Sequence, residues 1–103
     1  MSLNYWRFKM RAIGLLLLGR QAAAESVFGE MLERWPSDAY ALASRCHVRA
    51  QLGQRAAAIE DAQKLVQLHP ERSPGDWFNL AFLLEAEGSP VHAEGAFRRA
   101  LEM

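Results

Sequence analysis

A single cysteine, Cys46, stands among the 103 residues, so no disulfide can form within the chain. Nothing in the cysteine content points to an oxidising compartment, and the cytoplasm is the default expectation. The helical register described below turns Cys46 toward a partner helix, where its expected role is that of a small apolar filler.

An excess of charge of either sign is also lacking. The 12 basic and 12 acidic side chains give a formal net charge of zero, so no broad field attracts nucleic acid or anionic lipid. The apolar run at residues 12–18 is far shorter than the ~20 residues that span a bilayer. We therefore expect neither nucleic acid nor a membrane as a partner.

The same run has a second interpretation, because Arg7, Lys9 and Arg11 precede it and alanines at 22–24 follow it, as in a secretory signal. Arg20 interrupts the path to those alanines. The run also keeps the spacing of the later helices, so we interpret it as part of the folded domain.

Patterns of catalysis and metal binding are missing. His47, His69 and His92 occupy unrelated positions, and the sequence has no H-E-x-x-H, C-x-x-C or glycine-rich phosphate-binding motif. Cys46 and His47 are adjacent, but neighbouring helical residues point about 100° apart and do not form a catalytic pair. We expect no enzymatic activity, no metal and no cofactor.

What the chain does contain is a helical pattern, which is clearest after residue 76. Four apolar residues at i, i+3, i+4 and i+7 place one stripe on a helix. Gly88 ends this helix, Ser89 is an expected N-cap, and Pro90 suits the first turn of the next helix because it lacks the N–H that would be unpaired there. The stripe consists of Trp77, Leu80, Ala81 and Leu84.

Landmarks of this unit recur upstream. Gly19, Gly53 and Gly88 are separated by 34 and 35 residues, and a small residue follows each glycine at the same distance. The regular period predicts three copies of one helical hairpin. The small residues are Ala24, Ala58 and Ala93, and the prolines that close the first two units are Pro36 and Pro70.

The spacing W-x2-L-A-x2-L followed by A-x3-F resembles the tetratricopeptide repeat (TPR), a helical hairpin with a 34-residue period. The resemblance covers roughly residues 5–103. It implies an all-α, right-handed superhelical solenoid of three antiparallel helix pairs. Repeat one then spans about residues 5–38, repeat two about 39–73, and repeat three about 74–103.

The register also predicts where helices begin and end. We expect helices at about 4–18, from 20 or 21 to 34, from a cap at Ser37 or Asp38 to 52, and at 55–68, followed by the third pair. Ser73 and Asp76 predict a capping box, in which the Ser73 hydroxyl bonds the Asp76 amide and the Asp76 carboxylate reaches back.

Repeat two departs from the TPR pattern, because Arg45 and Arg49 stand where the family usually has Leu and Tyr. We expect that side of its first helix to pack loosely, with the arginine stems covering apolar neighbours while the guanidinium groups reach water.

The first helices of successive TPR repeats line the concave side of the superhelix, so the resemblance implies one shared groove here. The wall of this groove is expected to be mainly aromatic and apolar. Its residues are Trp6, Lys9, Met10, Ile13 and Leu17 from repeat one, Tyr40, Ala43, Ser44, His47 and Gln51 from repeat two, and Phe78, Asn79, Phe82 and Glu85 from repeat three.

Phe78 and Phe82 have two interpretations. Either they pack against the first helix of repeat two, or they form an apolar floor for a ligand side chain. The best-known TPR groove binds the C-terminal carboxylate of chaperones through a clamp of Lys, Asn and Arg, of which only Lys9 is matched here. We therefore expect a short apolar or aromatic peptide, or a single partner helix. The other clamp places hold Ile13, Ser44, Gly75 and Asn79.

The last helix supplies an alternative. Uncovered, it would expose Val91, Ala100 and Leu101 or their neighbours, and each large apolar side chain gains roughly 1.5–3 kcal/mol on burial. The chain is then expected to continue into further repeats or to pair with another copy as a homodimer through this helix. Under that alternative it is a structural segment rather than a peptide-binding scaffold.

Overall fold

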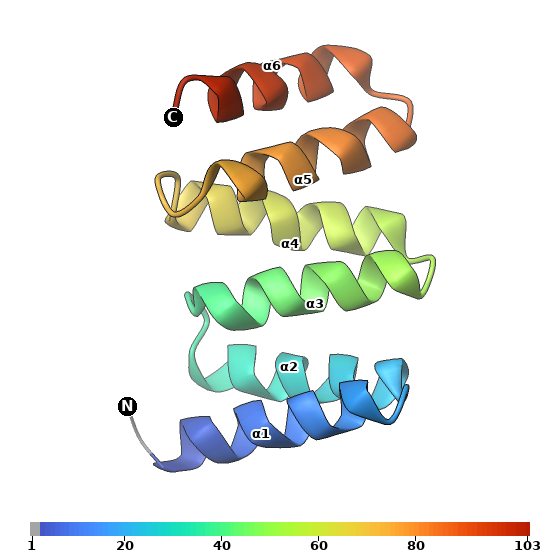
Figure 1. Cartoon of the computed structure of the whole chain (residues 1–103), viewed down its shortest axis with the longest axis vertical. Helices are drawn as coiled ribbons and strands as arrows, with labels where there is room; N and C mark the ends of the chain where they lie inside the picture. The colour runs from blue at the N-terminus through green and yellow to red at the C-terminus, as the bar shows by residue number, and fades with distance from the viewer. Residues whose placement is uncertain (1–2) are drawn as a thin grey trace.

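A computed structural model describes residues 3–103 as six α-helices joined by short turns. Each helix packs against the next, so the helices form a stack with α1 at one end and α6 at the other (Figure 1). The described residues form no strand, and the predicted all-α array of three antiparallel helix pairs is confirmed. The right-handed sense of the superhelix stays a prediction. The helices are α1 (Leu3–Leu17), α2 (Gln21–Arg34), α3 (Ala39–Gln51), α4 (Arg55–Leu68), α5 (Pro74–Ala86) and α6 (Pro90–Leu101).

The turn inside each pair is built on a glycine. Gly19, Gly53 and Gly88 have φ values of 73°, 80° and 85°, a region that side chains with a Cβ disfavour. In each turn the amide after the glycine donates to the carbonyl five residues earlier, which closes the first helix of the pair as in a Schellman motif. These hydrogen bonds run from Arg20 to Leu15, from Gln54 to Arg49 and from Ser89 to Leu84.

The helix caps follow the sequence only in part. Asp38 caps α3 as expected, because its Oδ2 accepts a hydrogen bond from the Ala41 amide at 3.0 Å. The capping box at α5 is wrong: the Ser73 hydroxyl accepts from the Gly75 amide at 3.0 Å, and the Asp76 carboxylate accepts from the Arg72 guanidinium instead. Arg72, in the loop before α5, donates to Asp76 at 2.6 Å and so takes the carboxylate that the capping box requires.

One further cap differs. Ser89 stands at the N-cap of α6, but its side chain makes no capping hydrogen bond.

Two clusters of buried apolar residues form the core. The first lies among α1, α2 and α3 together with Leu65 of α4, and has Phe28, Met31 and Leu42 at its centre. The second joins Cys46 of α3 to α4, α5 and α6. Cys46 is buried, in agreement with its predicted role as a filler. The small residues at the repeat landmarks, Ala24, Ala58 and Ala93, are buried too and let the helices approach closely.

The prediction of which α6 side chains are exposed is confirmed for two of the three residues. Val91 and Leu101 are exposed, but Ala100 is buried. The expectation for Ala100 is therefore wrong, because it shares one inward stripe with Ala93 and Ala96.

Candidate functional site

The first helices of successive repeats meet through their side chains. The Lys9 ammonium of α1 lies 4.9 Å from the ring centroid of Trp6 and 4.3 Å from that of Tyr40 on α3, which is cation–π geometry. Between α3 and α5, the Asn79 amide donates to the Cys46 sulfur at 3.3 Å. We call the surface of α1, α3 and α5 that carries Trp6, Lys9, Tyr40 and Asn79 the first-helix face.

A hollow of about 290 Å³ lies on this face between α1 and α3. Its walls are mostly apolar, while a hydroxyl, an imidazole and a guanidinium supply polar groups. The arrangement suits one apolar side chain together with hydrogen bonds to a peptide backbone. The lining residues are Leu16, Tyr40, Ala43, Ser44, His47, Val48 and Arg72.

Four of these lining residues belong to the predicted groove, whereas Leu16, Val48 and Arg72 do not. Leu16 and Val48 lie beside predicted positions on α1 and α3, so the helical register could have included them. Arg72 comes from the turn between α4 and α5, and no helical periodicity predicts where such a side chain points.

The remaining groove residues of α1 lie outside the hollow. Trp6, Met10 and Leu17 are exposed and Ile13 is half-buried. Gln51, at the far end of α3, turns toward α2, where its Oε1 accepts a hydrogen bond from the Gln21 amide at 2.8 Å.

Phe78 and Phe82 are turned toward α6. Their ring centroids lie 6.2 Å and 5.2 Å from that of Phe97, and Phe82 stays 61% exposed. The two phenylalanines thus form an aromatic group at the α6 end of the first-helix face, separate from the hollow at α1 and α3.

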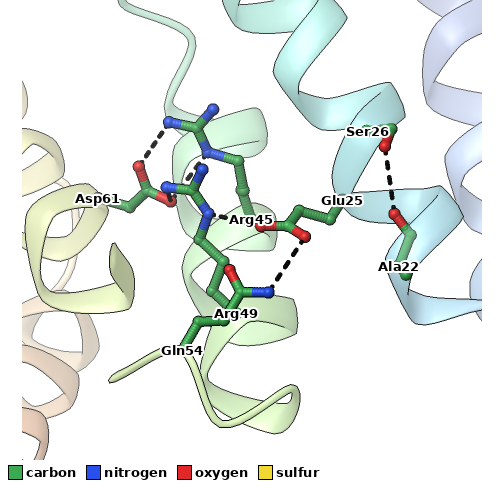
Figure 2. Close-up of polar contacts among 7 residues, drawn as sticks. All are labelled: Ala22, Glu25, Ser26, Arg45, Arg49, Gln54 and Asp61. Carbon is green, nitrogen blue, oxygen red and sulfur yellow. Dashed lines mark hydrogen bonds and ion pairs between the residues drawn. The ribbon is translucent and has the colours of Figure 1, made fainter. Parts of the chain in front are cut away.

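A charged cluster, unforeseen from the sequence, joins α2, α3 and α4 (Figure 2). Asp61 of α4 is only 3% exposed and accepts two hydrogen bonds from Arg45, at 2.7 and 2.9 Å, and one from Arg49 at 3.1 Å. Arg49 also donates to Glu25 of α2 at 2.9 Å. The predicted loose packing of this side is therefore wrong, because a buried carboxylate holds both guanidinium groups.

Two side chains titrate away from their ordinary range. Burial, followed by the hydrogen bond to the Asp38 carboxylate, raises the pKa of Tyr5 to about 12. Burial also raises the pKa of the Cys46 thiol, so this cysteine stays protonated at neutral pH and is a poor nucleophile and metal ligand.

Two other kinds of site are a metal centre and a membrane span, and residues 3–103 form neither. Across residues 3–103, no three side chains of His, Cys, Asp or Glu come together as a metal-binding group. None of the helices from Leu3 to Leu101 is both long and apolar enough to cross a membrane.

No protein-family model matches the chain, and no curated protein matches it. Solved structures do. MamA superposes with a TM-score of 0.88 at 18% identity, over 95% of this chain and 57% of the MamA chain. SycD, a type III secretion translocator chaperone of Yersinia enterocolitica, gives 0.86 at 20% identity over 99% of this chain and 76% of its own.

The TPR domain of Sgt2 from Aspergillus fumigatus gives a TM-score of 0.72 at 21% identity, over 98% of this chain and 76% of that domain. At such identities the likeness establishes the fold alone. The chain spans little more than half the length of the MamA chain.

Proposed function

Starting from the tetratricopeptide-repeat fold of this chain, we propose that it is a protein-interaction scaffold that binds a short apolar or aromatic peptide, or one partner helix, on the first-helix face. The hollow between α1 and α3 is the observation that carries this proposal. A volume of about 290 Å³ lies near the lower limit of small-ligand sites and accommodates one large side chain.

The surroundings of the hollow favour an extended ligand. Trp6 and Met10 offer exposed apolar surface along α1, and Phe82 offers more at α5. With helices ~10 Å apart, three first helices span roughly 20 Å, a length that about six extended residues cover.

The polar groups of the hollow fit a peptide backbone. The Ser44 hydroxyl can donate and accept, and the His47 imidazole can do either according to its tautomer. Arg72 is already paired with Asp76 at 2.6 Å, so its charge is largely matched and does not call for an anionic ligand.

The proposal is tested by selection from a random 12-residue peptide library displayed on phage, with the whole chain as bait. Enriched peptides are then synthesised and titrated by fluorescence anisotropy. We expect sequences with a large apolar or aromatic residue at a fixed place.

Two variants locate the binding surface. Ser44→Phe fills the hollow, and Phe82→Ala removes exposed aromatic surface; each should weaken the enriched peptide at least tenfold. Val91→Ala is the matched control, because it removes exposed apolar surface from the outer side of α6 and should leave the affinity unchanged.

Unfolding by urea shows whether each variant keeps its stability. The proposal fails if no peptide is enriched, or if the enriched peptides bind folded Ser44→Phe and Phe82→Ala as tightly as the parent chain.

A further inference from the structure

The α1 end of the stack carries a basic hollow. It has a volume of about 260 Å³ and is lined by Arg7, Arg11 and Arg34 together with Asn4 and Phe8. Residues 3–20 contain four basic and no acidic side chains, and the exposed Met10 and Leu17 add apolar surface to the same helix. This end is therefore basic and partly apolar.

The α6 end carries charges of both signs, because Glu94 of α6 pairs with Arg98 at 2.8 Å and Arg99 follows. Its hollow, of about 230 Å³, is lined by Glu85, Glu94 and Phe97 together with Pro90 and Ala93. Leu101 lies one turn after Phe97 on α6 and is 76% exposed. Residues 74–103 contain five acidic and two basic side chains. No helix among residues 3–103 covers either end (Figure 1).

The repeat register relates these two ends to a joint inside the molecule. Where α2 meets α3, the rings of Phe28 and Tyr40 lie 6.0 Å apart, edge to face. Two repeats after Phe28 the sequence has Phe97, and one repeat before Tyr40 it has Trp6. Half-buried Phe97 of α6 and exposed Trp6 of α1 thus stand at the two places where an aromatic pair joins one repeat to the next.

Other positions of that joint recur as well. Glu25, which accepts a hydrogen bond from an α3 arginine, has Glu94 as its counterpart on α6. Buried Leu32 of α2 corresponds to exposed Leu101, and buried Val48 of α3 corresponds to Gly14 of α1. Nothing lies within 4 Å of the place a Gly14 Cβ would take, so this side of α1 has room for a neighbour.

We propose that the α6 end of one chain docks on the α1 end of a second copy, head to tail. Phe97 then meets the second copy's Trp6, as Phe28 meets Tyr40 inside the chain. Because the two contacting surfaces differ, each docked copy leaves one free end of each kind, and the assembly grows without closing into a symmetric dimer.

Sedimentation velocity over a concentration series tests this proposal. We expect the weight-average mass to rise from the 11.6 kDa of one chain without reaching a plateau at two chains.

Two variants each block one end. Gly14→Lys places a long charged side chain on the α1 end, and lysine is a better helix former than glycine, so folding is preserved. Leu101→Lys blocks the α6 end at an exposed position. Gly95→Lys is the control, because Gly95 lies on the opposite side of α6 from the buried Ala93 and also has open space around it.

Mixing the two blocked variants distinguishes head-to-tail docking from symmetric pairing. Each alone should stay a single chain, whereas the mixture should form a complex of two chains and stop there, since only one competent pair of ends remains. The Gly95→Lys variant should associate like the parent chain.

Three outcomes overturn the proposal. The first outcome is that the parent chain stays monomeric at about 1 mM, a concentration at which only negligible affinity would go undetected. Gly14→Lys still dimerises while the mixture gains nothing, which indicates symmetric pairing through α6. Finally, Gly95→Lys abolishes association as Gly14→Lys does. Neither Gly14 nor Leu101 lines the peptide hollow, so these results are independent of the peptide-binding proposal.

Discussion

Replacement of Asp61 by asparagine removes one charge from the cluster that joins α2, α3 and α4. Asn has nearly the same shape, so the change leaves packing intact and isolates the charge. Asp61 accepts three hydrogen bonds from two guanidinium groups and is almost fully buried. Loss of one partner from a buried ion pair costs about 3–5 kcal/mol, because the remaining charge is left uncompensated.

The structure places the expected cost near the lower limit of that range. Arg49 keeps its bond to Glu25, and the side chains of Arg45 and Arg49 remain 20% exposed, so water reaches the orphaned guanidinium of Arg45. We expect a loss of about 3 kcal/mol in the free energy of unfolding. That loss is a large share of the ~5–15 kcal/mol that stabilises a typical domain.

A second variant separates charge from packing. In Arg45→Met combined with Asp61→Leu, apolar side chains replace the pair and the Arg49–Glu25 bond is kept. Such replacements are often neutral or stabilising, so this chain should unfold within about 1 kcal/mol of the parent or above it. Glu60→Gln, on the exposed side of α4, is the control and should change stability by less than about 0.5 kcal/mol.

The assay is urea unfolding followed by far-ultraviolet circular dichroism, extrapolated linearly to water. The reasoning is refuted if Asp61→Asn matches the control, or if the double apolar variant loses as much stability as the single charge deletion.

Two further predictions concern single residues. Because burial, followed by the bond to Asp38, raises the pKa of Tyr5 from 10.0 to about 12, folding keeps Tyr5 protonated; its titration leaves the free energy of unfolding unchanged below pH 10 and lowers it by roughly 2–3 kcal/mol as the pH rises to 12 and beyond. Urea unfolding of Tyr5→Phe should show a smaller loss over this window, and an identical loss would contradict the assignment. Gly53→Ala should lower stability by about 1 kcal/mol because of its positive φ, whereas Gly14→Ala, in mid-helix, should raise it by roughly 0.5–1 kcal/mol; equal thermal midpoints for the two would refute this contrast.

The sequence predicts the helices of this chain well because each boundary is a local event. The three turn glycines adopt positive φ values because they lack a Cβ, which depends on no other residue. Asp38 caps α3 by accepting a hydrogen bond from the amide only three residues later. The bounds of α2 and α4 agree with those expected from the register. The capping box at Ser73 failed because a neighbouring arginine competed for the Asp76 carboxylate.

The charged cluster escaped prediction because its partners lie on different helices. Arg45 and Arg49 break the apolar pattern of α3, and Asp61 breaks the apolar pattern of α4, between Ala58 and Ala62. Basic residues at apolar positions of α3 and an acidic residue at an apolar position of α4 occur in the same repeat. Their opposite charges could have predicted an ion pair between the two helices.

The sequence predicts only some of the residues that line the hollow between α1 and α3. Its residues on α3 follow from the register, whereas Arg72 comes from an irregular turn. Phe78 and Phe82 were assigned to the groove by their place on the helix, but ring packing on Phe97 decides their direction, and periodicity alone does not show that.

The division of the core into two clusters bears on how the chain is made. Synthesis runs from the N-terminus, and among the buried members of the first cluster only Leu65 belongs to α4. We therefore expect α1 to α3 to bury most of their apolar surface during synthesis, before α5 and α6 have left the ribosome. Arg49 can already bond Glu25 of α2 at that stage, whereas Arg45 stays hydrated until Asp61 of α4 is made and forms the ion pair that joins α4 to α3.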